Sequence, residues 1–182
     1  MQPITTERLI VRPFAASDLA DFLAYQSLPE VRMYMGGEPM SEEKAAKFIG
    51  QMAVAQGNEK GQYHAFAVYH PSDERVIGDV GFYLEEGPEE KGDLGFQFHP
   101  AYHGKGYAHE AASALMGYGF LQLNLRRITS GCDARNTASF QLMERLGLRR
   151  EAHFVQSRIT NGVLHNEYAY ALLRDEWLAR QA

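Results

Sequence analysis

The stretch that decides the fold runs from Phe96 to Ala111 and reads FQFHPAYHGKGYAHEA. Its alternating apolar start predicts a strand, Gly104 and Gly106 predict a loop, and its alanine-containing end predicts the first turn of a helix. A helix N-terminus carries unsatisfied N–H groups and a partial positive charge, and glycines just before it let an anion approach the backbone. The sequence therefore predicts a phosphate-binding loop at this point.

Two common phosphate-binding motifs do not fit this loop. The dinucleotide fingerprint Gly-x-Gly-x-x-Gly would need a third glycine where His109 stands, and it belongs to a βαβ unit, whereas three strand-like runs precede this loop. A Walker loop ends in Gly-Lys-Ser/Thr, but here Gly104-Lys105 is followed by Gly106. The spacing therefore disfavours a dinucleotide-binding fold and excludes a Walker-type nucleoside triphosphatase.

Outward from the loop, strand-like and helix-like segments follow one another with no long polar linker. Apolar and alternating runs predict strands at Arg8–Phe14, His64–Tyr69, Val76–Leu84, Asp93–His99, Arg127–Asp133, Phe154–Ile159 and Leu164–Leu173. Apolar residues at helical spacing predict helices at Asp18–Gln26, after the N-cap Ser41, at Ala108–Leu123 and at Thr137–Leu146. Asn161-Gly162 predicts the turn of a final hairpin. We expect a single α/β domain, residues 1–182, with a mixed, mostly antiparallel sheet of about seven strands flanked by about four helices.

The bulk composition narrows the function classes. The 182 residues are 45% hydrophobic, which is enough for one core. No apolar run approaches the roughly 18 residues of a membrane span, and Met1–Thr6 lacks a secretory pattern, so we expect a cytoplasmic protein that binds no membrane. The net charge of −5 argues against a nucleic-acid partner. Cys132 is the single cysteine; we expect it to be a core thiol, and we expect no metal site.

Several short motifs follow one another along almost the whole chain. They are Thr6–Pro13 (TERLIVRP), Gly104–Ala111 (GKGYAHEA), Asn136–Ser139 (NTAS), Leu146–Leu148 (LGL) and a closing segment, Tyr168–Trp177. In this order they resemble the GNAT superfamily of N-acetyltransferases, and most closely its RimJ/RimL-like branch. The pyrophosphate loop of that superfamily reads Gln/Arg-x-x-Gly-x-Gly/Ala. His103 stands at its first position here, which departs from the usual residue.

The resemblance implies acetyl-CoA as co-substrate and the transfer of its acetyl group to a primary amine. It favours the N-terminal α-amine of a protein as acceptor, with a small-molecule amine as the other option. It also implies that the strand before the loop splays from its neighbour, so that the pantetheine arm pairs with the strand's backbone. The residues expected to bind the co-substrate are Phe96, Gln97, Phe98, His103, Gly104, Lys105, Gly106, Tyr107, Ala108, Asn136 and Ser139.

An acceptor amine is protonated at neutral pH and must lose a proton before it attacks the thioester. Asp93 and Glu167 are the two residues that we consider for this role. Many GNAT enzymes place a tyrosine near the departing thiolate, but none follows Asn136 here, so Ser139 is our candidate hydrogen-bond donor to the sulfur. Asn136 also fits a helix N-cap, a role compatible with contact to the pantetheine arm.

The departures at the first loop position and at the tyrosine leave a second function open. A non-catalytic acyl-CoA-binding or regulatory domain would keep the phosphate loop without turnover. An amine-bearing acceptor is the partner expected of the enzyme, and a homodimer remains open.

Overall fold

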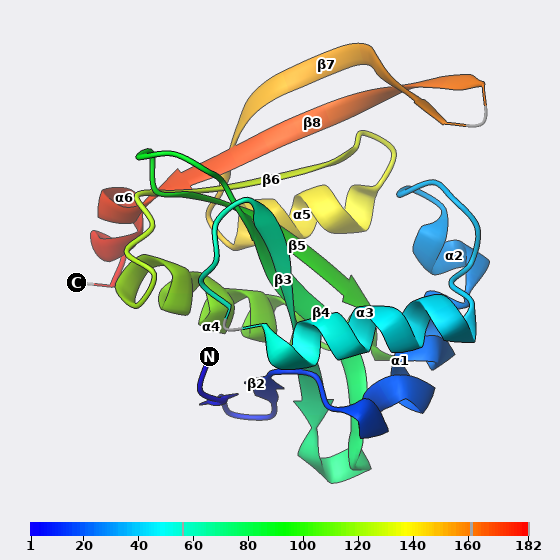
Figure 1. Cartoon of the computed structure of the whole chain (residues 1–182). Coiled ribbons are helices and arrows are strands. Elements are labelled where there is room, and N and C mark those ends of the chain that lie inside the picture. The colour runs from blue at the N-terminus through cyan, green and yellow to red at the C-terminus, as the bar shows by residue number, and fades with distance from the viewer. Residues whose placement is uncertain (56, 161, 182) are drawn as a thin grey trace.

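The structure, a computed structural model, describes residues 1–55, 57–160 and 162–181. Within them, eight strands form one sheet in the order β1-β2-β3-β4-β5-β6-β8-β7 (Figure 1). The strands are β1 (Ile4–Thr5), β2 (Ile10–Arg12), β3 (Gln62–His70), β4 (Arg75–Leu84), β5 (Lys91–Phe98), β6 (Arg127–Asp133), β7 (Arg149–Thr160) and β8 (Val163–Leu173). The helices are α1 (Leu19–Gln26), α2 (Pro29–Arg32), α3 (Glu42–Val54), α4 (Tyr107–Leu121), α5 (Thr137–Arg145) and α6 (Arg174–Leu178).

The predicted α/β class and the mostly antiparallel sheet are confirmed, with β5 and β6 as a parallel pair. The expected first strand, Arg8–Phe14, is present as the shorter β2, and β1, which was not expected, pairs with it as a hairpin. The turn between them is closed by the Thr6 N–H, which donates to the Leu9 carbonyl, and by the Leu9 N–H, which donates to the Thr6 hydroxyl. Two short helices, α2 and α6, were not expected. The final hairpin is present as β7 and β8, although Asn161 of its predicted turn lies outside the described residues.

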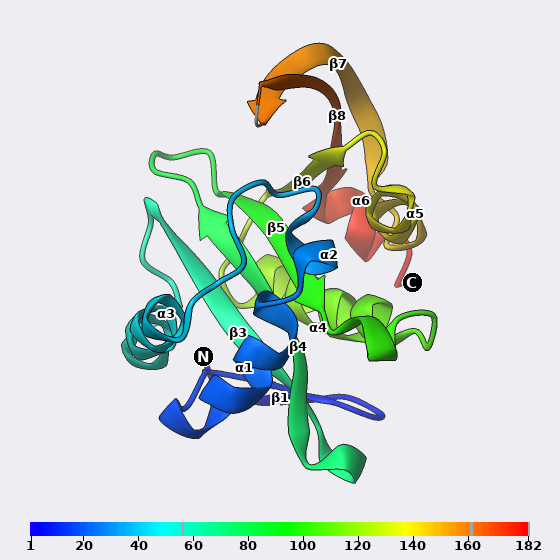
Figure 2. The same cartoon turned by 90° about the vertical axis from the view of Figure 1, so that its right-hand side faces the viewer.

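Helices cover both faces of the sheet, each over its own apolar cluster. Figure 2 shows α3 on one side and α4 and α5 on the other. Phe22, Tyr25, Ala45 and Ile49 of α1 and α3 are buried on the first side. On the second side the buried residues of α4 and α5 are Ala111, Ala112, Leu115, Met116, Phe120, Leu142 and Met143. No helix in the described part of the chain is long and apolar enough to cross a membrane.

The parallel pair β5 and β6 separates part-way along its length. Register partners run only from Lys91 with Arg127 to Asp93 with Thr129. Just beyond them, the Ser130 hydroxyl donates a hydrogen bond of 2.8 Å to the Leu94 carbonyl, in place of a backbone donor. The rest of β5 pairs only with β4 on its other edge. This is the splay that the family resemblance implies, and it opens the middle of the sheet.

Candidate active site

A cavity of about 1140 Å³ lies where β5 and β6 separate. Residues from β5, the glycine loop, α5 and β8 line it, together with residues from α1, α2 and the segment after α2. Most of the expected site residues share this lining, namely Phe96, Gln97, Phe98, His103, Gly104, Gly106, Tyr107, Ala108, Asn136, Ser139 and Glu167. Asp93 and the Lys105 side chain are not part of it. The structure therefore brings together residues as far apart in the sequence as Phe96 and Glu167.

The glycine loop has the backbone that its sequence predicts. Gly104 and Gly106 have φ of 73° and 84°, in the left-handed region that favours glycine, and Gly106 is the N-cap of α4. The His103 Nε2 lies 3.0 Å from the Phe98 carbonyl and holds the start of the loop against the end of β5. Thus His103, unusual at the first loop position, positions the loop by a contact within the protein.

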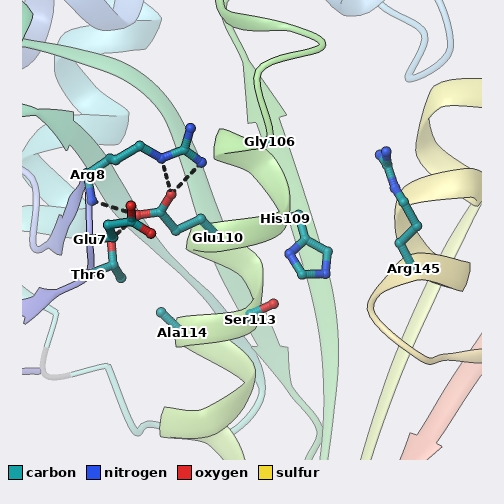
Figure 3. A pocket seen from close by; sticks show the side chains of 9 residues that line it. All are labelled: Thr6, Glu7, Arg8, Gly106, His109, Glu110, Ser113, Ala114 and Arg145. Atoms are coloured by element: carbon teal, nitrogen blue, oxygen red, sulfur yellow. Dashed lines mark hydrogen bonds and ion pairs between the residues drawn. The ribbon is translucent and has the colours of Figure 1, made fainter.

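A clamp of Thr6, Arg8 and Glu110 fixes the other end of the loop (Figure 3). Glu110, in the first turn of α4, accepts hydrogen bonds from the Thr6 hydroxyl at 2.6 Å, the Arg8 backbone N–H at 2.8 Å and the Arg8 Nε at 2.7 Å. Arg8 Nη1 also donates to the Lys105 carbonyl at 3.0 Å. Partial burial raises the pKa of Glu110, but these donors outweigh it and lower the pKa below its usual value. The signal for this clamp was the Thr6–Pro13 motif, which sequence reasoning did not connect to the loop.

A second pocket, of about 780 Å³, continues from the main cavity past the start of α4 (Figure 3). Gly106, His109 and Arg145 line both. In Figure 3 His109 of α4 and Arg145 of α5 flank the space between the two helices. The glycine loop is therefore followed by a groove that carries a guanidinium and an imidazole.

The N-terminus of α5 lies on the opposite wall of the cavity. The Asn136 side-chain oxygen accepts a hydrogen bond of 3.2 Å from the Ser139 N–H, which confirms the predicted N-cap. Cys132 was expected in the core, but it is only half-buried and lines the cavity, because β6 turns this face toward the splay. Burial raises the pKa of the Cys132 thiol more than hydrogen bonding to Ser139 lowers it, so the thiol stays protonated at neutral pH.

The two expected carboxylates have different surroundings. Asp93 is exposed and accepts a hydrogen bond of 2.8 Å from the Thr129 hydroxyl, at the last paired position of β5 and β6. Glu167 lines the cavity, where it accepts a hydrogen bond of 2.9 Å from the Ser157 hydroxyl and lies 3.3 Å from the Arg158 guanidinium. Of the two, Glu167 is the one placed beside the cavity.

A third carboxylate, Asp79, was not considered from the sequence. It lies in the middle of β4, is 1% exposed, and lines the same cavity. The Tyr25 hydroxyl donates a hydrogen bond of 2.7 Å to it. Burial raises the pKa of Asp79 to about 7, although hydrogen bonds from Tyr25 and Gln26 act in the opposite direction. The sequence carries one signal for this residue, a single charge inside the otherwise apolar run of residues 76–84.

Comparisons with known proteins agree with this architecture. The model of the GNAT acetyltransferase domain matches residues 8–149. The chain is 34% identical to the uncharacterized N-acetyltransferase YnaD of Bacillus subtilis, over 96% of this chain and 98% of YnaD. A crystal structure of a GNAT-family acetyltransferase from Bacillus anthracis superposes with a TM-score of 0.86 at 31% identity and covers 96% of this chain and 100% of its own.

A more distant structure shares the fold with a ligand bound. RimL, a ribosomal L7/L12 α-N-protein acetyltransferase in complex with coenzyme A, has a TM-score of 0.83 at 18% identity, covering 96% of this chain and 99% of RimL. The open seam of the sheet, the glycine loop before α4 and these similarities lead to one assignment. The chain belongs to the GNAT family of acetyltransferases and is an N-acetyltransferase.

Proposed function

We propose that the protein transfers the acetyl group of acetyl-CoA directly to a primary amine, with a protein N-terminal α-amine as the favoured acceptor and a small-molecule amine as the second choice. The observation that carries this proposal is the left-handed glycine loop at the start of α4, which opens into the cavity at the seam between β5 and β6. The favoured acceptor follows from a place in the RimJ/RimL-like branch, which we propose from the order of the sequence motifs.

The shape of the cavity supports one orientation of acetyl-CoA. The pyrophosphate would lie against the backbone of residues 103–108, where the helix N-terminus favours an anion. The pantetheine arm would run along Phe96–Phe98, whose outer edge has no register partner in β6 within the described residues. The nucleotide end would enter the second pocket, beside His109 and Arg145. Lys105, which is part of the loop, would offer a further cation to the phosphates.

The acetyl group would then lie near Ser139 and Glu167, which face the seam from α5 and β8. Strand N–H groups at the seam would hydrogen-bond the oxyanion that forms when the amine attacks. Ser139 would donate a hydrogen bond to the departing sulfur, while Asn136 contacts the pantetheine arm. Glu167 would attract the acceptor's ammonium. The Arg158 guanidinium, 3.3 Å from the Glu167 carboxylate, would weaken this attraction. Asp93 would act at a distance, by holding β5 to β6 where the seam begins.

The experiment that tests this function joins binding to turnover in the same samples. Calorimetric titration with acetyl-CoA, dephospho-CoA and adenosine measures whether affinity depends on the pyrophosphate, and thiol release is then followed with peptides, lysine amide and polyamines. We expect micromolar binding that adenosine does not reproduce, and thiol release that is fastest with free peptide N-termini. Binding without thiol release from any amine would favour the non-catalytic acyl-CoA-binding domain instead, and a lack of binding would overturn the proposal.

A matched pair of glycine variants tests the loop itself. Gly106→Ala places a Cβ on a residue with φ of 84°, and we expect it to weaken acetyl-CoA binding at least about tenfold, because the loop must change its backbone. Gly162→Ala is the control, since Gly162 has φ of 75° but lies in the β7–β8 turn with open space around it. Equal effects on affinity in the two variants would show general strain and remove the loop from the binding site.

A further inference from the structure

Four residues of β4 and β5 form a small patch on the face of the sheet that α1 covers. Asp79 is the register partner of Gln97, and Gly81 is the register partner of Gly95. Asp79 and Gln97 both reach α1, through the hydroxyl of Tyr25 and the amide of Gln26. Two polar side chains therefore stand next to two positions that have no side chain at all.

The glycine pair leaves room for the side chain of Tyr63. A Cβ at Gly81 or Gly95 would lie 2.7 or 2.8 Å from the hydroxyl of Tyr63, which reaches over both from β3. Tyr63, Gly95 and Asp79 all line the main cavity. The patch is thus a polar floor that runs from Asp79 to Gly95, two residues beyond Asp93, the last residue of β5 that pairs with β6.

The groups around Asp79 hold it in place without neutralising it. Tyr25 from α1 donates to its Oδ1 at 2.7 Å, and Tyr63 from β3 lies on the same floor. Burial is the largest cause that raises the pKa of both tyrosines, so they remain protonated hydrogen-bond donors at neutral pH. The neighbour from β5, Gln97, is uncharged.

Arg32 is a cation that contacts this network through Gln26 and not through Asp79. Arg32 of α2 reaches the network at the Gln26 side-chain oxygen, 3.5 Å away. A buried carboxylate costs free energy unless a cation or a proton accompanies it. Asp79 has neutral donors around it and a cavity in front of it. It is therefore suited to bind a cation or to accept a proton from the cavity.

We propose that Asp79 is the catalytic base that takes a proton from the acceptor's ammonium, on the α1 side of the sheet, a role that rests on the proposed acetyltransferase function. The acceptor R–NH₃⁺ gives one proton to the Asp79 carboxylate, directly or through one water. The neutral nitrogen forms its bond to the acetyl carbon and the carbon–sulfur bond breaks. The coenzyme thiolate takes a second proton from that nitrogen, and Asp79 returns its proton to water when the products leave.

Asp79 fits this role better than the carboxylates that the sequence suggested. The Arg158 guanidinium lies 3.3 Å from one carboxylate oxygen of Glu167 and the Ser157 hydroxyl donates to the other, so both oxygens already have partners within the protein. Asp93 lies outside the cavity lining. Tyr34, Met35 and Val31 line the same cavity as Asp79, so the space in front of Asp79 includes apolar surface that suits an amine carried on a partly apolar group.

The test is the pH dependence of kcat at saturating acceptor, measured as thiol release for wild type, Asp79→Asn, Glu167→Gln and Asp93→Asn. A base that titrates near pH 7 makes wild-type kcat fall about tenfold for each pH unit below that value, because the protonated carboxyl cannot accept a proton. We expect Asp79→Asn to lower kcat at pH 8 at least about 100-fold and to abolish this acid limb. Calorimetric affinity for acetyl-CoA should stay within about twofold of wild type, which shows that the variant is folded.

A second variant keeps the test decisive if Asp79→Asn does not fold. Tyr25→Phe removes a hydrogen bond that stabilises the Asp79 carboxylate, so the acid limb should move to higher pH while the acetyl-CoA affinity is kept. An acid limb that is unchanged in both variants, or lost in Glu167→Gln instead, would overturn the role of Asp79 alone. Absence of thiol release from the wild type would overturn the proposed function, and the role of Asp79 with it.

Discussion

Arg8 and Glu110 are 102 residues apart in the chain, yet the Arg8 Nε lies 2.7 Å from a carboxylate oxygen of Glu110. Arg8 also contacts the Lys105 carbonyl, and its guanidinium lies 4.6 Å from the centre of the Tyr107 ring. One side chain from the N-terminal hairpin therefore touches the loop, the first residue of α4 and the first turn of that helix. The loop conformation depends on a segment that lines none of the main cavity.

This relationship predicts a binding defect from a residue outside the main cavity. Arg8→Ala should raise the KM for acetyl-CoA roughly tenfold and change kcat little, because the loop loses its anchor but the seam of the sheet keeps its geometry. Steady-state kinetics with varied acetyl-CoA would measure this. Arg126→Ala, which removes an exposed arginine of the same charge, is the matched control. An unchanged KM in Arg8→Ala would show that α4 alone holds the loop.

Ser139 offers a prediction about the leaving group. Ser139→Ala should lower kcat about tenfold and leave the KM for acetyl-CoA nearly unchanged, since a hydrogen bond to the sulfur matters most when the carbon–sulfur bond breaks. Thr137→Ala, an exposed residue of the same helix, should keep wild-type kcat. Turnover equal to that of wild type in Ser139→Ala would remove this hydroxyl from the chemistry.

The contact between Gly95 and Tyr63 on the polar floor predicts that substitutions at these two residues have non-additive effects on stability. Gly95→Ala places a Cβ 2.8 Å from the Tyr63 hydroxyl, whereas the ring carbons are 3.5 Å away, so Tyr63→Phe should relieve most of the clash. In a double-mutant cycle measured by urea unfolding, the double variant should lose roughly 1 kcal/mol less stability than the sum of the two single variants. Gly50→Ala, with open space around it in α3, should stabilise the protein by up to about 1 kcal/mol. Additive effects of Gly95→Ala and Tyr63→Phe would contradict the contact.

The surroundings of Asp133 predict part of the loss of folding stability at low pH. Hydrogen bonds from the Arg135 side chain, at 2.9 and 2.7 Å, lower the pKa of Asp133 to about 2 from 3.8. A pKa that is lower in the folded state adds stability above the unfolded value near 4, and this stability is lost as the pH falls toward 2. Because Arg135 is 58% exposed and solvent screens the pair, we expect a contribution of roughly 1 kcal/mol at neutral pH.

Urea unfolding between pH 6 and pH 3 measures this contribution. Asp133→Asn should be less stable than wild type at pH 6, and the difference should shrink as the pH approaches 3. Glu89→Gln, which removes an exposed loop carboxylate, should show no such trend. A stability difference between Asp133→Asn and wild type that stays constant with pH would contradict the low pKa of Asp133.

The sequence predicted the parts of the fold that local patterns specify. The strand, glycine loop and helix around Gly104 and Gly106 carry turn and helix signals within a few residues of each other, and the structure has them at those places. Strand β1 was missed because its two residues are too few for an alternating pattern to show. Helix α2 has four residues, too few for a helical period to show.

The missed site residues depend on contacts that no local pattern encodes. Asp79 lines the cavity only in the folded chain, where α1 places Tyr25 and β5 places Gln97 beside it. The clamp on Glu110 likewise requires β1 and β2 to lie against α4. Single-sequence reasoning could have flagged Asp79 as an unpaired charge in an apolar strand, but its neighbours come from the tertiary fold.

If acetyl-CoA binds at the seam between β5 and β6 as proposed above, the lifetime of the folded protein depends on the supply of this co-substrate. The outer edge of Phe96–Phe98 gains no partner from β6 within the described residues, so the sheet is unfinished there. A ligand that pairs with this edge binds the folded chain and not the unfolded one. At a hundred times its Kd such a ligand adds about 2.7 kcal/mol to the free energy of unfolding. Heat and proteases, which act on the opened chain, would therefore destroy this enzyme fastest when acetyl-CoA runs low.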